Sequence, residues 1–250
     1  MVTYWKIKIP QLSGDKERLV YVYLPDNWKT AGKRYPVLYM FDGHNVFFDS
    51  HATYGKSWGM SEYLDANDKE LMVVAVECNH EGNKRLEEYS PVDFEIPDLG
   101  FIHGHGREYM DWLVNTLKPY IDANYPTLPE REHTSLAGSS MGGLMALYGV
   151  CEFNHVFRKA ACISPSLWIS KDKILESVEA SNIANDSVIY MGYGSVEMPD
   201  HAPSSEALIS VTRLLLTRRV NVALKIFPGG THNESSWEKQ IPLFMDYLGL

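Results

Sequence analysis

Short apolar runs, each followed by turn residues, constrain the fold of this chain most strongly. Residues 36–41 (PVLYMF) and 71–77 (LMVVAVE) are almost wholly apolar, and residues 19–24 (LVYVYL) alternate like a strand. Runs of this length are typical of strands buried on both faces of a parallel sheet. Similar patterns predict further strands at 134–137, 159–163, 187–193 and 222–227.

Helical patterns alternate with these strands. Between residues 109 and 121 the mostly apolar positions recur at intervals of three and four, and Pro119 should kink that helix or end its first part. A second helix is expected at about 204–218, and a last helix carries Trp237, Ile241, Phe244 and Leu248. The weakly periodic stretch from residue 78 to about 106 is expected to be a loop near the substrate. The alternation predicts one α/β domain over residues 1–250, with a mostly parallel sheet and helices on both faces.

Composition limits the kinds of partner and the cellular compartment that we expect for this protein. The 250 residues carry a formal net charge of -9, which argues against a nucleic-acid partner because phosphate binding needs clustered Lys and Arg. No signal-peptide core and no run of transmembrane length is found, so no membrane partner is expected. The three cysteines lack C-x-x-C spacing, and we expect free thiols in a cytoplasmic protein: Cys78, Cys151 and Cys162. A homodimer is compatible with the sequence, which does not decide the oligomeric state.

The pentapeptide GSSMG (residues 138–142) lies between a predicted strand and an apolar helical pattern. In that context G-x-S-x-G is the pattern of the nucleophile elbow, a strained turn that holds a serine hydroxyl clear of the sheet. Larger side chains two residues before and after the serine would collide with neighbouring elements. Centred on Ser140 these positions are Gly138 and Gly142, whereas centred on Ser139 they are an alanine and a bulky methionine. Ser140 is therefore the predicted nucleophile.

A serine hydroxyl needs a general base, and the base needs a carboxylate that orients it. In this architecture the chain order is serine, then acid, then histidine. His232 follows the last predicted strand and is the predicted base, with His155 and His201 as weaker alternatives. Glu197 is closer than Asp200 to the end of the preceding strand, where the backbone is better fixed, and is the predicted acid.

Backbone N–H groups are expected to stabilise the oxyanion. One is the N–H of Met141, directly after the nucleophile, and the other lies near Gly43 or His44, in the loop after residues 36–41. The sequence predicts no metal and no cofactor, since the histidine groups that suggest a metal lie in irregular segments without a fixed face. Those groups are His103 with His105, and His44 with Asp49 and His51.

Several motifs together resemble the esterase family of α/β-hydrolases, over most of the chain. They are VLYMFDGHNVFFD, NKRLEEYSP, LKPYIDANYPT, AGSSMGGLMALYG, ISPSLW and the GSVE loop. This family includes siderophore (enterobactin-type) esterases, feruloyl esterases, S-formylglutathione hydrolase and mycolyltransferases. The resemblance implies the α/β-hydrolase fold, with Ser140 as nucleophile, Glu197 as acid and His232 as base.

The resemblance also bears on the substrate pocket. It implies that Arg85, Tyr89 and Trp168 lie around the acyl or alcohol group. Many members carry Gln where this sequence has His44, so the substrate does not carry over. The sequence thus predicts a serine carboxylic-ester hydrolase that acts on a small-molecule ester through an acyl-enzyme. An acyltransferase with the same triad, and a binding protein on the same fold, are the alternatives.

Overall fold

The computed structural model describes residues 1–250 except Asn27 and Pro199. Within the described residues one large sheet has eight strands in the order β1-β2-β4-β3-β7-β8-β9-β10. Their bounds are β1 Val2–Lys8, β2 Glu17–Tyr23, β3 Val37–Met40, β4 Met72–Val76, β7 Thr134–Ser139, β8 Lys159–Ile163, β9 Val188–Gly194 and β10 Asn221–Phe227. Every strand expected from the sequence is present within one or two residues, and β1 was not foreseen.

The sheet is mostly parallel, as predicted. All neighbouring pairs from β4 to β10 are parallel, whereas β1 pairs antiparallel with β2, and β2 pairs antiparallel with β4. The parallel strands β3, β4 and β7 are buried along their whole length, which explains their continuous apolar character. The carboxyl ends of the parallel strands meet at one edge, where loops from distant parts of the sequence converge.

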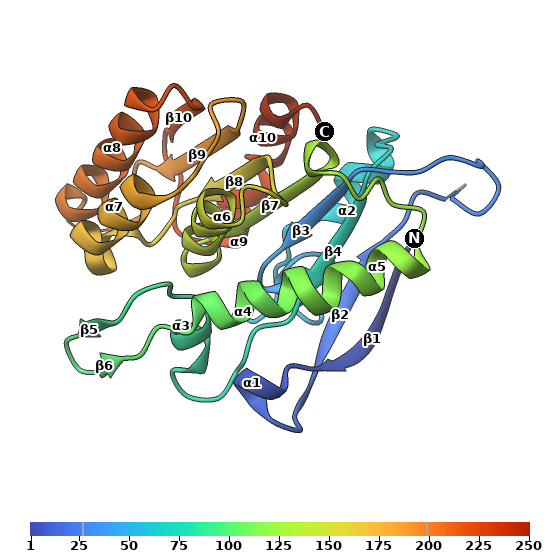
Figure 1. Cartoon of the computed structure of the whole chain (residues 1–250), viewed down its shortest axis with the longest axis horizontal. Coiled ribbons are helices and arrows are strands. Elements are labelled where there is room, and N and C mark those ends of the chain that lie inside the picture. The colour runs from blue at the N-terminus through green and yellow to red at the C-terminus, as the bar shows by residue number, and fades with distance from the viewer. Residues whose placement is uncertain (27, 199) are drawn as a thin grey trace.

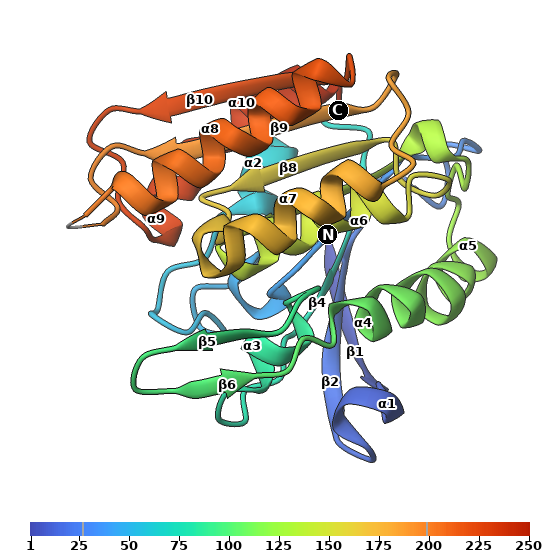
Figure 2. The ribbon, with the colours of Figure 1, turned by 60° about the vertical axis from the view of Figure 1, so that its left-hand side comes forward.

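Helices cover both faces of the sheet, which confirms the predicted α/β architecture (Figures 1 and 2). One face packs against α4 Gly106–Trp112, α5 Lys118–Asn124, α6 Met141–Glu152, α7 Lys171–Ala180 and α8 Ala202–Thr217. The other face packs against α2 Met60–Ala66, α9 Glu234–Glu238 and α10 Ile241–Leu248. Two buried apolar clusters result, one on each side of the sheet.

The helix expected around residues 109–121 is longer than predicted and is not interrupted at Pro119. Helix α4 continues through a π-helical segment, η2 Leu113–Leu117, directly into α5 (Figure 1). Pro119 lies in the first turn of α5. Its missing N–H removes only a backbone hydrogen bond to the preceding turn. The wider π segment accommodates that missing donor, so the helix continues through the proline.

The last helix differs from the prediction because it is two helices. Helix α9 ends at Glu238, and α10 begins at Ile241 with a proline, Pro242, in its first turn. Pro242 cannot donate to the carbonyl four residues earlier, which favours a break between the two helices at this point. Each short helix nevertheless buries its apolar positions, Trp237 in α9 and Phe244 in α10.

Residues 78–106, expected to be a loop, contain short elements. Helix α3 spans Lys84–Glu88, and β5 Phe94–Ile96 pairs with β6 Gly100–Ile102 in a separate hairpin. These elements have only three to five residues, too few to show a period in the sequence. The remaining short helices are α1 Pro10–Ser13, η1 Gly43–Asn45, η3 Arg131–His133 and η4 Leu167–Ser170. Among the described residues no helix combines the length and apolar character needed to cross a bilayer.

Candidate active site

Ser140 lies on the tight turn between β7 and α6. Its backbone has φ 56° and ψ -123°, a conformation that is strained for any residue with a side chain. A Cβ on Gly138 would lie 2.5 Å from the carbonyl oxygen of Gly142, and a Cβ on Gly142 would lie 2.9 Å from Cβ of Phe41. The collisions that the sequence predicted on either side of Ser140 are therefore real, and glycine at both positions removes them.

Backbone hydrogen bonds hold this turn against β8 and the segment that follows it. The N–H of Ser140 donates to the carbonyl of Ile163 over 2.9 Å, and the N–H of Ser166 donates to the carbonyl of Ser140 over 3.1 Å. The Ser140 hydroxyl lies 3.3 Å from that of Ser166. The neighbouring Ser139 is buried at the end of β7. The turn thus presents the hydroxyl of Ser140 at the carboxyl edge of the sheet.

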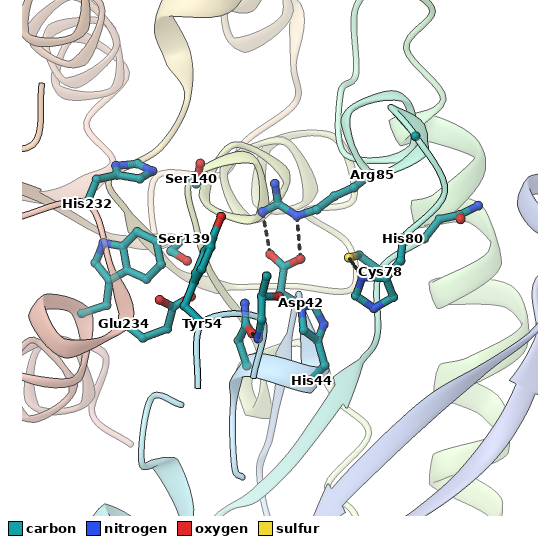
Figure 3. Close-up of a pocket in the computed structure, with 15 residues that line it drawn as sticks. Asp42, His44, Tyr54, Cys78, His80, Arg85, Ser139, Ser140, His232 and Glu234 are labelled. Atoms are coloured by element: carbon teal, nitrogen blue, oxygen red, sulfur yellow. Dashed lines mark hydrogen bonds and ion pairs between the residues drawn. The ribbon is translucent and has the colours of Figure 1, made fainter. Parts of the chain in front are cut away.

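Glu197 and His232 form a hydrogen-bonded pair beside this turn. Nδ1 of His232 lies 3.0 Å from Oε2 of Glu197, although the two residues are 35 positions apart. The Glu197 side chain is 1% exposed and that of His232 is 34% exposed, so the carboxylate is buried while the ring reaches the pocket. A buried carboxylate at Nδ1 favours the tautomer whose Nε2 is free to accept a proton. In Figure 3 the His232 ring lies beside the Ser140 hydroxyl.

The Glu197 carboxylate is fixed by a network that the sequence did not reveal. Its Oε1 accepts from the hydroxyl of Ser164 and from the N–H of Gly194. The indole N–H of Trp237 donates to the same Ser164 hydroxyl over 2.9 Å. The Trp237 ring also packs edge-on against His232, with ring centroids 5.1 Å apart. One tryptophan and one serine therefore support both members of the pair.

The alternatives considered for acid and base have other partners. Asp200 accepts from the N–H of Ala202 at the start of α8. His201 pairs through Nδ1 with the hydroxyl of Tyr193 over 3.1 Å. His155 lies exposed beside Phe153, away from the carboxyl edge of the sheet. Of the predicted candidates, Glu197 and His232 are the pair brought together with Ser140.

A pocket of about 360 Å³ opens above Ser140 and is lined by Ser139, Ser140, His232 and Trp237 (Figure 3). The other lining residues are mostly of polar type. They are Asp42, His44, Asn45, Thr53, Tyr54, Asn79, His80, Arg85 and Glu234, together with Cys78 and Gly82. Tyr54 is 83% exposed at this wall. Burial raises the pKa of the Glu234 carboxyl. This wall offers hydrogen-bond donors and acceptors to a polar ligand.

Arg85 reaches the pocket from α3 and is held by Asp42. The guanidinium donates to both carboxylate oxygens of Asp42, over 2.7 and 2.8 Å. Burial alone would raise the pKa of Asp42, but Arg85 holds that pKa below its ordinary value. Arg85 and Ser140 line the same pocket, so this pair places a fixed cationic side chain in the wall of the pocket that contains the Ser140 turn (Figure 3).

Two residues implied to lie around the pocket do not line it. Tyr89 is fully buried, and its hydroxyl accepts from the N–H of Asp42 over 3.1 Å. Trp168 is 40% exposed in η4, outside the set of pocket residues. A family resemblance predicts which position of the sequence has a given side chain. It does not predict the orientation of that side chain, which depends on local packing. Tyr89 therefore contacts the loop that shapes the pocket and does not reach the pocket itself.

The predicted oxyanion donors lie at two chain segments beside the pocket. Met141 is the first residue of α6 and Gly43 is the first residue of η1, so neither N–H has an acceptor within its own helix. His44 follows in η1 and lines the pocket. A Cβ on Gly43 would lie 2.7 Å from the backbone of Ala75. Glycine is thus needed here for close contact with β4.

The members of the two histidine groups that we rejected as metal sites from the sequence pair with other residues in the structure. Nδ1 of His105 pairs with Glu108, and Nδ1 of His51 pairs with the hydroxyl of Tyr21. Asp49 accepts from the N–H and hydroxyl of Ser57. His44 lies instead beside His80, with ring centroids 4.6 Å apart, a neighbour that spacing along the chain did not suggest.

Comparisons with known proteins agree with this architecture. The family model described as "Putative esterase" matches residues 13–245. The uncharacterized protein YbbA of Bacillus subtilis is 25% identical over 182 residues, which cover 70% of this chain and 67% of YbbA. The siderophore triacetylfusarinine C esterase of Aspergillus fumigatus is 24% identical over 196 residues, 74% of this chain and 65% of that protein. The esterase Rv1288 of Mycobacterium tuberculosis is 28% identical over 181 residues, 71% of this chain, which spans about a third (35%) of that relative.

Solved structures show the same fold. An IroE-like serine hydrolase from Shewanella oneidensis superposes with a TM-score of 0.76 at 17% identity, covering 99% of this chain and 79% of that one. The BES protein of Bacillus cereus has a TM-score of 0.74 at 19% identity, covering 99% of this chain and 94% of that one. Because the family model covers most of the sequence, the resemblance found in the motifs is confirmed: the chain belongs to this esterase family of α/β-hydrolases and is a carboxylic-ester hydrolase.

Proposed function

We propose that the protein hydrolyses a small-molecule carboxylic ester with a Ser140–His232–Glu197 triad. The observation that carries the proposal is the 3.0 Å contact between Nδ1 of His232 and the buried Glu197 carboxylate, with His232 lining the same pocket as the strained Ser140. This combination supplies a nucleophile, a base in a defined tautomer and a carboxylate that stabilises the imidazolium. The Ser140 hydroxyl, which faces Ser166, turns toward the ring when substrate enters, because catalytic hydrogen bonds often tighten only in the bound complex.

The reaction proceeds in two half-reactions. Oγ of Ser140 attacks the ester carbonyl while Nε2 of His232 takes its proton, and the tetrahedral oxyanion accepts from the N–H groups of Met141 and the Gly43–His44 turn. The imidazolium then gives its proton to the departing alkoxide, which leaves as the alcohol. Water attacks the acyl-enzyme with His232 again as base, and collapse of the second tetrahedral intermediate releases the acid and restores Ser140.

Labelling by a fluorophosphonate tests the nucleophile. Wild type is expected to be labelled, and Ser140→Ala to lose labelling together with at least about 10⁴-fold of kcat on a p-nitrophenyl ester. Ser139→Ala is the matched variant because it removes the adjacent hydroxyl from the same turn, and it should still be labelled. Labelling that survives in Ser140→Ala and is lost in Ser139→Ala would overturn the assignment.

The polar wall of the pocket supports a substrate that carries several hydroxyl or carbonyl groups. Related proteins are named as a siderophore triacetylfusarinine C esterase, a ferulic acid esterase and an S-formylglutathione hydrolase, so their ester classes form the natural panel. Short p-nitrophenyl esters, feruloyl and acetylated sugars, and triscatecholate lactones should be compared by kcat/KM. A preference for the apolar p-nitrophenyl esters over every polar ester would contradict this part of the proposal.

Acyl transfer uses the same acyl-enzyme with another acceptor, and product analysis in the presence of added alcohols separates it from hydrolysis. A binding protein on this fold would show neither labelling nor turnover. The cytoplasm is the proposed compartment, supported by three buried cysteines that are all unpaired. A homodimer, and the absence of a nucleic-acid partner at a net charge of -9, remain predictions from the sequence.

A further inference from the structure

Three metal-ligating side chains converge in the pocket wall away from Ser140. They are His44 of η1, and Cys78 and His80 of the loop after β4; one ligand atom from each lies within 4.8 Å of the others. Sγ of Cys78 is 3.9 Å from Nδ1 of His80. Figure 3 shows Cys78 beside the Asp42–Arg85 pair, with the two histidines next to it. The triad of the proposed ester hydrolysis uses none of these three side chains.

The second nitrogen of each histidine is already held by an oxygen. Nε2 of His80 lies 3.1 Å from Oε1 of Glu77, and Nε2 of His44 lies 3.0 Å from Oγ1 of Thr53. With the ring proton on Nε2 in each case, both Nδ1 atoms keep a lone pair. A histidine that binds a metal ordinarily has this arrangement, in which the other nitrogen donates to a carboxylate or hydroxyl and fixes the ring.

His44 supplies an independent sign that a ligand is accommodated here. Its side chain is 5% exposed, and its Nδ1 is buried without a hydrogen-bond partner in the part of the chain that the structure describes. Buried ring nitrogens in a packed core are ordinarily paired, because an unpaired one loses its hydrogen bond to water without a replacement, at a cost in free energy. A metal ion that accepts the Nδ1 lone pair would remove that cost.

We propose that His44, Cys78 and His80 bind one Zn²⁺ ion through Nδ1, Sγ and Nδ1. Tetrahedral Zn²⁺ with bonds of about 2.0–2.3 Å holds its ligand atoms about 3.3–3.6 Å apart. The separations of up to 4.8 Å therefore shorten by about 1 Å on binding. The His80 side chain is 52% exposed and is free to make that movement.

The charges around the three ligands suit a divalent cation. Glu77 lies behind His80, and the Asp42 carboxylate lies beside Cys78. Arg85 is the nearby cation, and its charge is already matched by Asp42. Zn²⁺ takes the place of the thiol proton, which is released to solvent, and binds the resulting thiolate. One sulfur and two nitrogens select zinc over magnesium or calcium, which prefer oxygen ligands.

Three protein ligands leave the fourth position of the ion for water or an oxygen of a ligand in the pocket, since all three residues line it. None of the three ligand side chains belongs to the proposed triad, and the test measures ion binding, so it does not depend on turnover. The proposed site differs from the sequence-based prediction of no metal site. The sequence did not reveal this cluster because His44 lies far along the chain from Cys78 and His80.

Titration with ZnCl₂ by calorimetry, on protein first stripped with a chelator that is then removed, should give one equivalent of bound ion. Co²⁺ should give the near-ultraviolet charge-transfer band of a cobalt–thiolate bond. His80→Ala, at a half-exposed position, and Cys78→Ser should each lose the binding, and Cys78→Ser should lose the band. Glu77→Gln, which removes the charge behind His80, should weaken binding by about 10–100-fold.

Matched controls are Cys151→Ser and His103→Ala, a buried cysteine and an exposed histidine outside the pocket, and both should bind Zn²⁺ like wild type. Circular dichroism confirms that each variant is folded. The proposal is overturned if stripped wild type takes up no ion at stoichiometric Zn²⁺. It is also overturned if folded His80→Ala and Cys78→Ser both bind as tightly as wild type, or if Co²⁺ binds without the thiolate band.

Discussion

At the scale of single residues, the proposed activity depends on the hydrogen bonds that fix the Glu197 carboxylate in place. Glu197 uses one carboxylate oxygen for His232 and the other for Ser164 and the N–H of Gly194. Both oxygens are therefore occupied, and the carboxylate cannot rotate without losing a partner. A buried, fully bonded carboxylate is what holds an imidazole in one tautomer.

Glu197→Gln should lower kcat for ester hydrolysis by about 10²–10⁴-fold with little change in KM, because an amide cannot stabilise the imidazolium by its charge. Steady-state kinetics on a p-nitrophenyl ester measure this effect. Asp200→Asn neutralises another carboxylate of the same loop, which accepts from the N–H of Ala202, and should keep the wild-type kcat. The reverse result, with kcat lost only in Asp200→Asn, would identify Asp200 as the acid.

Ser164 is expected to be a positioning residue. Its hydroxyl connects the indole of Trp237 to the Glu197 carboxylate, and a hydrogen bond to a charged group is worth about 1.5–3 kcal/mol, so Ser164→Ala should lower kcat by about 10-fold or more. A merely structural role would instead lower the melting temperature and leave the kcat of the folded fraction unchanged.

At the scale of elements, the turn between β7 and α6 sets the position of the nucleophile. It is tied to β8 through the bond from Ser140 to Ile163 and to the following segment through Ser166. The flanking glycines allow the strand and the helix to approach each other closely. The strain at Ser140 is therefore maintained by packing around the whole turn and not by the residue alone.

Gly138→Ala tests this packing. The added methyl group would lie 2.5 Å from a backbone oxygen of Gly142, and backbone cannot move aside as a flexible side chain can. The expected result is a loss of about 1–3 kcal/mol of unfolding free energy, measured by urea denaturation, together with reduced activity. Ser139→Ala, which removes an atom from the same turn, should change the stability far less. An unchanged urea midpoint in Gly138→Ala would mean that the turn is looser than described.

At the scale of the whole molecule, the sheet brings distant loops together at the carboxyl ends of its parallel strands. Polar contacts fix the segments at the opposite, amino ends of these strands. Arg131 of η3 donates to both carboxylate oxygens of Asp186, over 2.9 and 3.0 Å, and also to Asn154 and Ser187. This cluster joins the segments that lead into β7, β8 and β9. It stabilises the order of the central strands at the edge away from the pocket.

The Asp186 contact should make stability depend on pH in the acid range. Hydrogen bonds from Arg131 hold the pKa of Asp186 below its ordinary value of 3.8, so the folded state binds a proton less readily than the unfolded chain. Its contribution is present above pH 3.8 and is lost as the pH falls through the lower folded value. The urea midpoint of Asp186→Asn should therefore lie below that of wild type near neutral pH and converge with it at low pH. A difference that stays constant with pH would contradict this linkage.

Sequence patterns predicted those parts of the site that depend on local structure. The strands were found because β3, β4 and β7 are buried on both faces, which leaves a continuous apolar run. Ser140 was distinguished from Ser139 by the size of residues two positions away. The chain order of serine, acid and histidine then singled out Glu197 and His232, which the structure brings within 3.0 Å. Helix boundaries were less predictable, because Pro119 and Pro242 act differently in their two settings.

The sequence by itself determined the layered α/β architecture and the nucleophile candidate, since both depend on residues that are near neighbours along the chain. Tertiary structure alone decided which side chains support and line the site. Asp42 meets Arg85 across 43 positions, and Trp237 meets Ser164 across 73. His44 likewise joins Cys78 and His80 only because two loops end at the same edge of the sheet. Periodicity and spacing report contacts made within one element, whereas contacts between loops exist only after the strands have taken their order in the sheet.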